Sequence, residues 1–238
     1  MFYLQLLGDF IFDQHKNYDM KIGIFGTGTV GDTIGSRLVE LGHEVMMGSR
    51  TSNNEKAEAF AQKHSQSLAS AGTFAEAADF GEILFNCTKG EVSVDAILAA
   101  GPGIAGKILV DVANPLDFSK GMPPGLIPSL SNTHSLGEEI QTRFPKLKVV
   151  KTLNTMWCGI MVNPAMINDG NHTNFICGND GDAKSIIRKL LNEFGWKDEH
   201  ILDLGDISSA RGTEAVLPVW LRIYGAKKSG AFNFNVVS

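Results

Sequence analysis

The sequence of 238 residues is short of cysteine and of positive charge, and each shortage narrows the possible functions. Its three cysteines, Cys87, Cys158 and Cys177, lie far apart and form neither a C-x-x-C pair nor a zinc-ligand spacing. We therefore expect no metal site, and reduced thiols in a cytoplasmic protein, because disulfides belong to oxidising compartments. The formal net charge of −5 and the lack of a long basic run argue against binding to nucleic-acid phosphates or to a membrane surface.

The N-terminal segment also lacks an apolar run long enough to span a bilayer. Residues 1–19 have no basic stretch before their apolar start and contain Asp9 and Asp13, which makes a poor signal peptide. Met20 then opens the stretch MKIGIFGTG, which reads like a natural protein start. We expect residues 1–19 to be an N-terminal extension and residues 20–238 to form one domain.

From Lys21 onward, short apolar runs alternate with helical patterns. Val30, Ile34, Leu38 and Leu41 recur at spacings of four, four and three, which indicates one buried face of a helix. The runs EILFNCT and KILVDVAN are continuously apolar, as in strands buried on both faces of a parallel sheet. The pattern predicts an α/β fold, Rossmann-like and doubly wound, with a mostly parallel sheet and a small C-terminal helical region.

The expected elements cover most of the chain. Strands are expected at 21–26, 44–49, 67–70, 82–88, 107–114, 147–154, 174–178 and 201–205, and helices at 53–64, 73–81, 92–101, 137–144, 182–194 and 208–224. Residues 117–132 read as a loop, Ser135 and Glu138 as a capping box, and Pro218 as a kink in the last helix. The alternating residues 231–237 indicate an edge strand or an arm packed on a partner. Residues 179–238 are expected to form a smaller cap over the active-site cleft.

A glycine-rich turn follows the first strand and opens the first helix. In GTGTVG, Gly26 would allow the tight turn, Gly28 the close approach of a pyrophosphate, and Gly31 the packing of helix on strand. The pyrophosphate would lie at the helix N-terminus, where free N–H groups favour an anion. The alternative is that these glycines only make a turn.

The end of the second strand indicates which dinucleotide binds. NAD-binding proteins usually have a carboxylate there, which accepts hydrogen bonds from the ribose 2′-hydroxyl. This chain has Ser49, Arg50 and Thr51 at that place, with Lys56 shortly after. A guanidinium and hydroxyls suit a 2′-phosphate, so the predicted cofactor is NADP(H), unless Arg50 is only a solvated surface side chain.

Polar residues end the central strands, where ligands of open α/β sheets bind. Asn86 ends the fourth strand, Asn114 the fifth and Asn154 the sixth. His134 lies in a loop near this edge and is either a proton donor or a loop histidine at a helix start. The residues expected to bind the cofactor are Gly26, Thr27, Gly28, Thr29, Val30, Gly31, Ser49, Arg50, Thr51, Lys56, Cys87, Thr88, Lys89, Asn114, Pro115 and Asn154, and the catalytic candidates are Asn154, Thr155 and His134.

The absence of a legible Ser/His/Asp or Cys/His arrangement favours hydride transfer, in which the cofactor carries the chemistry. The stretch MKIGIFGTGTVGDTIGSRLVELGHEVMMGSR resembles the opening of the NADPH-dependent coenzyme F-420 reductases, the deazaflavin-dependent NADP oxidoreductase family. The similarity continues through VDVANPLDF, VVKTLNTM and LDLGDISSARGTEAVLPVWLRIYG, and so covers nearly everything from Met20 onward. The ferric-reductase domain of the mammalian STEAP proteins is a more distant relative of the same fold.

The resemblance implies reversible hydride transfer between NADPH and a planar deazaflavin, coenzyme F-420, stacked against the nicotinamide. It implies that Asn154 and Thr155 lie near the rings, and that the residues holding NADP include Thr27, Thr29, Val30, Ser49, Arg50 and Thr51. The archaeal members have a histidine near the end of the sixth strand, where this chain has Leu153, Asn154 and Thr155. A flavin or another small-molecule electron acceptor therefore stays open beside the deazaflavin.

Two other functions stay open as well: an imine or hydroxyacid reductase, and a non-catalytic NADPH-binding sensor protein. Arg211 either steers an acidic electron carrier or pairs with Glu214 at a spacing of three. The apolar helix LPVWLRIYG and the alternating C-terminal arm expose more apolar surface than a monomer needs, which favours a homodimer. No nucleic-acid or membrane partner is expected.

Overall fold

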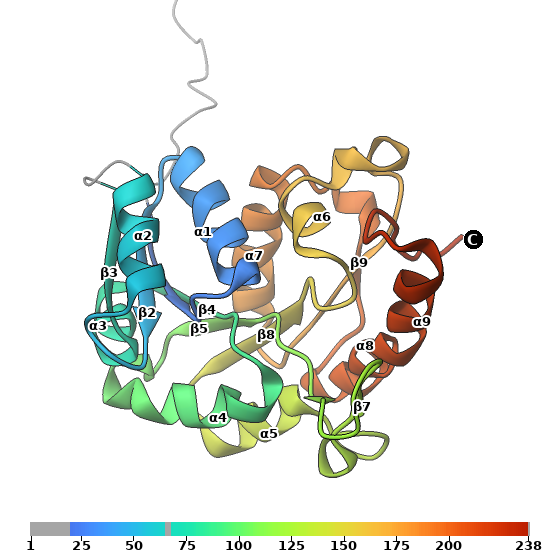
Figure 1. Cartoon of the computed structure of the whole chain (residues 1–238), viewed down its shortest axis with the longest axis horizontal. Coiled ribbons are helices and arrows are strands. Elements are labelled where there is room, and N and C mark those ends of the chain that lie inside the picture. The colour runs from blue at the N-terminus through green and yellow to red at the C-terminus, as the bar shows by residue number, and fades with distance from the viewer. Residues whose placement is uncertain (1–19, 65–67, 238) are drawn as a thin grey trace, which may run out of the picture.

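The computed structural model describes residues 20–64 and 68–237, and Figure 1 shows a sheet between two layers of helices. The expected N-terminal extension lies outside the described residues. In the described part, eight strands form one sheet in the order β10-β9-β8-β5-β4-β1-β2-β3. Their bounds are β1 Lys21–Phe25, β2 Glu44–Ser49, β3 Ala69–Thr73, β4 Ile83–Asn86, β5 Ile108–Asp111, β8 Lys148–Thr152, β9 Asn174–Cys177 and β10 Ile201–Asp203.

All neighbouring strands of this sheet pair in parallel except β8 and β9, which pair antiparallel. The carboxyl ends of β1, β2, β3, β4, β5 and β8 therefore share one edge of the sheet. The doubly wound, mostly parallel α/β fold is confirmed. Because β9 runs back, it and β10 point the other way, a reversal that the apolar pattern of the sequence does not encode.

The strands are apolar on both faces because helices cover both. Ile83 and Phe85 of β4 contribute to the core on one face, while Leu84 between them contributes to the core on the other. The first face is covered by α1 (Thr29–Glu40), α2 (Glu55–Lys63), α6 (Cys158–Val162) and α7 (Gly181–Glu193), and the second by α3 (Phe74–Phe80), α4 (Gly90–Ala99), α5 (Leu136–Arg143) and α8 (Ala210–Ala215). A strand between two apolar layers cannot alternate, which explains the continuous runs of the sequence.

Two local expectations are partly right. The expected loop contains a short antiparallel pair, β6 (Leu116–Asp117) with β7 (Gly125–Leu126), and the turn η2 (Pro128–Leu130). Ser135 caps α5 by accepting from the Glu138 backbone N–H at 3.1 Å, but the Glu138 carboxylate binds Arg211. The expected capping box is therefore present in one half, because a distant arginine is a stronger partner for that carboxylate than a neutral N–H.

Two boundaries also shift. The third strand, expected at 67–70, is β3 at Ala69–Thr73, and Ser67 lies outside the described residues. The expected last helix is divided into η6 (Ile207–Ser209), α8 and α9 (Leu217–Lys227). The break lies at Val216, because Pro218 occupies the first turn of α9, where a missing N–H costs no helical hydrogen bond.

The C-terminal arm, residues 231–237, does not form the expected edge strand. Thr173 donates its N–H to the carbonyl of Phe234 at 3.0 Å, but the Asn233 side chain also donates to the carbonyl of Thr173, which competes with a strand ladder. The ring of Phe232 stacks on Trp220 of α9. The arm therefore packs on its own chain. Across the described ranges, none of the helices has the length and apolar character needed to cross a membrane.

Candidate functional site

The glycine turn has the geometry that its spacing predicts. Gly26 has a φ of +117°, which favours glycine, and its N–H donates to the carbonyl of Gly48 at 3.1 Å. A Cβ on Gly31 would lie 2.0 Å from the Gly26 carbonyl oxygen, so α1 can begin here only with glycine at that position. At Gly28, by contrast, no heavy atom of the described residues lies within 4 Å of a built Cβ. The turn is therefore tightly packed at Gly31 and has open space beside Gly28.

The open side of the turn leads to the N-terminus of α1. Gly28 is the N-cap, and within the described residues no side chain caps the helix there. The first N–H groups of the helix and its dipole therefore favour an anion at this point. A dinucleotide pyrophosphate fits this turn, because the space beside Gly28 holds no side chain and is open to a ligand.

The end of β2 is basic and has a fixed loop. Ser49 is buried, and its hydroxyl donates to the carbonyl of Thr51 at 2.5 Å. Ser49 therefore shapes the loop, while Arg50, Thr51 and Lys56 are exposed. Arg50 has no ion-pair or hydrogen-bond partner among the described residues. A cation left unpaired at this strand end supports the prediction of a 2′-phosphate site more strongly than its position in the sequence does.

A pocket of about 190 Å³ lies on the other side of β1, at the carboxyl ends of β4 and β5. None of the described residues that line it is acidic or a histidine, and Lys89 is its one charged side chain. The lining residues are Val30, Cys87, Thr88, Lys89, Gly90, Val112, Ala113, Asn114, Leu116 and Phe118. Four of these, Cys87, Thr88, Lys89 and Asn114, were expected from the strand ends, and Val30 was expected from the glycine turn. Ala113, Leu116 and Phe118 were not, because an apolar residue after a strand reads as core or loop.

Asn114 and Asn154 are brought together behind this pocket. Asn154 is buried, and its Oδ1 has no hydrogen-bond partner among the described residues. The preceding Leu153 has a φ of +62°, a conformation that is uncommon outside glycine. This backbone turn places the Asn154 amide directly beside Asn114. Thr155 is buried next to it, whereas neither Asn154 nor Pro115 is itself part of the pocket lining.

His134 and Cys87 have surroundings that argue against catalysis. His134 Nε2 lies 3.1 Å from the Glu139 carboxylate at the start of α5, and His134 does not line the pocket. This arrangement supports the interpretation as a loop histidine. Burial, and after it the nearby carboxylate of Asp111, raises the pKa of the Cys87 thiol well above its usual value. Cys87 therefore contributes a neutral wall and no thiolate nucleophile.

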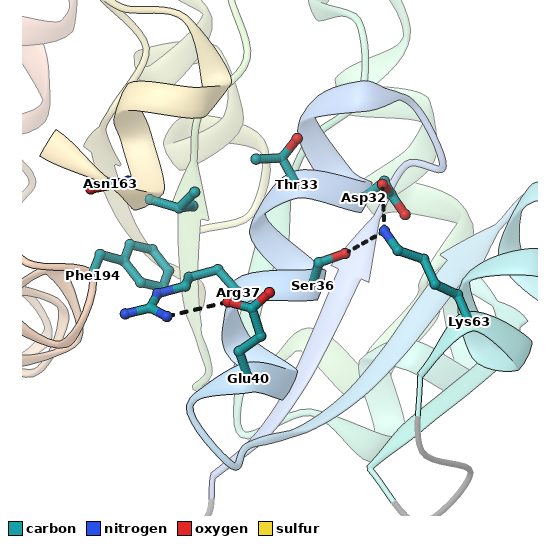
Figure 2. Close-up of a pocket in the computed structure, with 9 residues that line it drawn as sticks. Asp32, Thr33, Ser36, Arg37, Glu40, Lys63, Asn163 and Phe194 are labelled. Carbon is teal, nitrogen blue, oxygen red and sulfur yellow. Dashed lines mark hydrogen bonds and ion pairs between the residues drawn. The ribbon is translucent and has the colours of Figure 1, made fainter. Parts of the chain in front are cut away.

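A second and larger cavity, of about 450 Å³, lies beside α1 rather than at the strand ends. Figure 2 shows the residues that line it. Its charges are paired with one another: Lys63 with Asp32 at 3.3 Å, and Arg37 with Glu40 at 3.2 Å. No strand end opens into it. Size alone would favour this cavity, but the smaller pocket adjoins the glycine turn, so the smaller pocket is the candidate site.

Of the two alternatives left open for Arg211, the pairing with Glu214 is wrong. The Arg211 guanidinium binds both carboxylate oxygens of Glu138, at 2.5 and 2.8 Å. Glu214 is buried and accepts instead from the N–H groups of Leu136 and Gly137 at the start of α5. Both carboxylates therefore join the start of α5 to α8. Glu138 of α5 accepts from the Arg211 side chain, and Glu214 of α8 accepts from backbone N–H groups of α5.

A parallel sheet with a glycine turn, an uncapped helix N-terminus and a pocket at the strand ends defines a dinucleotide-binding protein of the oxidoreductase class. The family model of the NADP oxidoreductases, coenzyme F420-dependent, matches residues 21–115. A crystal structure of a candidate F420-dependent NADP-reductase from Arthrobacter sp. FB24 is 47% identical, covers 92% of this chain and 100% of that chain, and has a TM-score of 0.84. The chain belongs to the coenzyme F420-dependent NADP oxidoreductase family.

Two curated proteins that the chain resembles are an F420-dependent NADP reductase and a metalloreductase. The F420-dependent NADP reductase of Methanocaldococcus jannaschii is 27% identical over 223 residues, which cover 89% of this chain and 96% of that protein. The metalloreductase STEAP3 of Rattus norvegicus is 32% identical over 206 residues, 84% of this chain but only 38% of STEAP3. A reductive aminase from Aspergillus terreus, at 21% identity and a TM-score of 0.61, shares the fold. The chain is thus an NADP-dependent oxidoreductase.

Proposed function

We propose that this protein transfers a hydride between NADPH and a planar acceptor, a deazaflavin or a flavin. The observation that carries the proposal is the chemical character of the strand-end pocket. Its described lining contains no carboxylate and no histidine, and the Phe118 ring lies beside Lys89, whose Nζ is 5.8 Å from the ring centroid. Such walls exclude water and accept flat rings, and they supply no strong acid or base. That suits a reaction in which the cofactor carries the chemistry.

Each half of the dinucleotide has a proposed binding region. The pyrophosphate would lie over Gly28 at the start of α1, and Arg50 with Thr51 and Lys56 would hold the 2′-phosphate. The nicotinamide half would then extend across β1 into the pocket at the ends of β4 and β5. NADPH, when bound there, supplies the hydride. The buried Asn154 Oδ1, which lacks a partner in the described residues, would accept a hydrogen bond from the nicotinamide amide.

The acceptor is proposed from the names of the relatives together with the pocket. A deazaflavin is supported by the F420-dependent reductases that the chain resembles over most of its length. A flavin stays beside it because this chain has Leu153, Asn154 and Thr155 where a histidine was expected for a deazaflavin enzyme. The fold shared with reductive aminases lies below 25% identity and gives no support to an imine substrate.

The test is to mix purified protein with NADPH and, in separate reactions, coenzyme F420, FMN or FAD, and to follow the loss of NADPH absorbance. We expect rapid oxidation with one of the three and slow oxidation of NADH under the same conditions. Turnover of small imines without reduction of any of the three would establish the imine reductase instead. Tight NADPH binding with no oxidation by any acceptor would establish a sensor protein.

We also propose a cytoplasmic homodimer. Val219 and Tyr224 are exposed on α9 although the neighbouring Trp220 is covered by Phe232 of the same chain. A second copy of the chain would bury these exposed apolar side chains. The three cysteines are all free thiols, which suits a reducing compartment. That residues 179–238 cap the cleft stays a prediction, since β10 in this segment is part of the main sheet.

A further inference from the structure

Three charged side chains form a buried chain beneath the pocket, and the sequence pattern gives no indication of it. Lys151 Nζ on β8 lies 2.8 Å from Asp111 Oδ2 at the end of β5 and 2.7 Å from Glu214 Oε1 on α8. None of the three side chains is more than 2% exposed. Buried ion pairs carry a large desolvation cost and are often replaceable by apolar residues without loss of stability. Stability alone is therefore a weak explanation for this one.

The ion pair holds the backbone of a pocket residue at both of its polar groups. Lys151 Nζ donates to the carbonyl oxygen of Ala113 at 2.6 Å, and the N–H of Ala113 donates to Asp111 Oδ1 at 3.2 Å. Ala113 lines the pocket, and the next residue, Asn114, forms the pair with Asn154. A Cβ on Gly90 would lie 2.2 Å from the Asn114 carbonyl oxygen, so this segment also packs tightly against the start of α4.

A second branch reaches another lining residue of the pocket. Asp111 Oδ1 accepts from Asn86 Nδ2 at 2.8 Å, and Asn86 Oδ1 accepts from the hydroxyl of Thr88 at 2.6 Å. Thr88 also lines the pocket. One buried carboxylate thus links the pocket residues that follow β4 and β5, and its counter-ion is Lys151.

The ammonium group has an acceptor for each of its three donors: Asp111, Glu214 and the Ala113 carbonyl. Burial alone would lower the pKa of Lys151, but the two carboxylates outweigh burial and raise the pKa above its usual value. Lys151 therefore stays protonated at neutral pH and keeps all three contacts.

We propose that Lys151 is a positioning residue for the nicotinamide half of the cofactor. It fixes the Ala113 carbonyl directly and the Thr88 side chain through Asp111 and Asn86. The inference rests on the proposed function, because it takes the pocket at the ends of β4 and β5 as the nicotinamide site. A shift of either residue would misplace the ring that gives up the hydride, while the adenosine half, across β1, would be held as before.

The test compares two ligands in one variant, Lys151→Met. NADPH spans both halves of the site, whereas adenosine 2′,5′-bisphosphate carries only the adenosine half. We expect the Kd of NADPH, from its fluorescence, to rise at least about tenfold and that of the bisphosphate to change less than roughly twofold. Lys151→Arg, which keeps the charge and the donors, should restore most of the NADPH affinity.

A matched control is His43→Leu. His43 is also fully buried and pairs with a carboxylate, Glu193, at 2.9 Å, but it lies at the amino end of β2, away from the pocket. This variant should lose thermal stability and bind both ligands like the natural protein. If Lys151→Met does not fold, the variant D111N/K151M/E214Q leaves no unpaired charge in the core and should show the same split between the two ligands.

The outcomes separate the two proposals. Failure of the natural protein to bind the bisphosphate contradicts the proposed 2′-phosphate site and leaves the Lys151 comparison to be read from NADPH alone. Equal NADPH affinity in the natural protein and the Lys151 variants overturns the positioning role. So does an equal loss of both ligands, because that is the effect of general destabilisation.

Discussion

Asn114 and Asn154 exchange hydrogen bonds across forty residues of sequence: Asn114 Nδ2 donates to the Asn154 carbonyl at 2.8 Å, and Asn154 Nδ2 donates to Asn114 Oδ1 at 2.9 Å. This pair joins the ends of β5 and β8 behind the pocket. Both donors of the pair are used inside the protein, whereas Asn154 Oδ1 has no partner in the described part of the chain. Asn154 Oδ1 is therefore the acceptor of this pair whose hydrogen bond is left unmade within the described residues.

The first prediction concerns this acceptor. Asn154→Ala should lower stability by about 1–3 kcal/mol, because Asn114 Oδ1 loses its donor inside the protein. It should also lower kcat and weaken NADPH binding, since the group that orients the nicotinamide amide is gone. Thermal unfolding and NADPH titration measure the two effects. Asn192→Ala removes a comparable hydrogen bond, from the Asn192 side-chain amide to the Trp196 carbonyl just after α7, and should lower stability without changing NADPH binding. Equal NADPH affinity in Asn154→Ala and Asn192→Ala would contradict a role in binding.

The second prediction concerns the choice of dinucleotide. Arg50→Glu should raise the KM for NADPH far more than that for NADH. It replaces an exposed cation without a partner in the described residues by a carboxylate that repels a 2′-phosphate. Hydrogen bonds to charged groups are worth about 1.5–3 kcal/mol, so the expected loss is about tenfold to a hundredfold. Lys189→Glu on α7 makes the same charge change at an exposed position away from β2 and should leave both KM values unchanged. Equal effects of Arg50→Glu on both cofactors would remove the 2′-phosphate argument.

The third prediction uses the contrast between the open and closed sides of the glycine turn. Gly28→Ala meets no atom of the described residues and has a φ of −82°, which alanine adopts readily. The variant should be as stable as the natural protein, or more stable by about 0.4–1 kcal/mol, because alanine has less freedom in the unfolded chain. NADPH affinity should nevertheless fall at least about tenfold, since the methyl group occupies the place of the pyrophosphate.

Gly212→Ala is the matched control for this prediction. Gly212 lies in α8, and a Cβ built there also meets no heavy atom of the described residues. The variant should gain stability in the same range and keep full NADPH affinity. If Gly28→Ala also keeps full affinity, the pyrophosphate does not bind over this turn.

The fourth prediction concerns stability against pH. The hydrogen bonds from Arg211, and after them the one from Ser135, hold the pKa of Glu138 below its ordinary value of 4.5. A carboxylate whose folded-state pKa is lowered contributes stability above its unfolded pKa, and loses that contribution as the pH falls through the folded-state value. Arg211→Met should therefore lower Tm at pH 7, and lower it progressively less below about pH 4. Arg50 lacks an acidic partner in the described residues, so the difference in Tm between Arg50→Met and the natural protein should not change with pH.

Short-range patterns in the sequence were sufficient for the glycine turn and for the basic end of β2. Gly26, Gly28 and Gly31 act within six residues, so their spacing carries their geometry. The same holds for Ser49 and Arg50, which follow a strand whose apolar pattern marks its end. Local chemistry of this kind is visible without a structure, because chain connectivity alone brings the groups together.

Long-range pairs could not be predicted. A spacing of three residues on one helix offered Glu214 as one alternative partner for Arg211, yet Arg211 binds Glu138, seventy-three residues away. Lys151 lies within an apolar strand, and nothing in that strand indicates that two carboxylates from other elements surround it. The antiparallel pairing of β9 with β8 is likewise not marked in the residues of β9. Each of these features is fixed by tertiary contacts, which periodicity does not record.

The last prediction concerns assembly. Val219 and Tyr224 of α9 are both exposed, whereas Trp220 of the same helix is stacked between Tyr224 and Phe232. Val219→Asp should convert a homodimer into a monomer, because an unpaired carboxylate cannot be buried in an apolar interface without a large cost. Sedimentation measures the change, and circular dichroism should show an unaltered fold. Ile186→Asp places the same charge at another exposed apolar position, on α7, and should leave the dimer intact. A natural protein that sediments as a monomer, or a dimer that only Ile186→Asp disrupts, would show that α9 is not the interface.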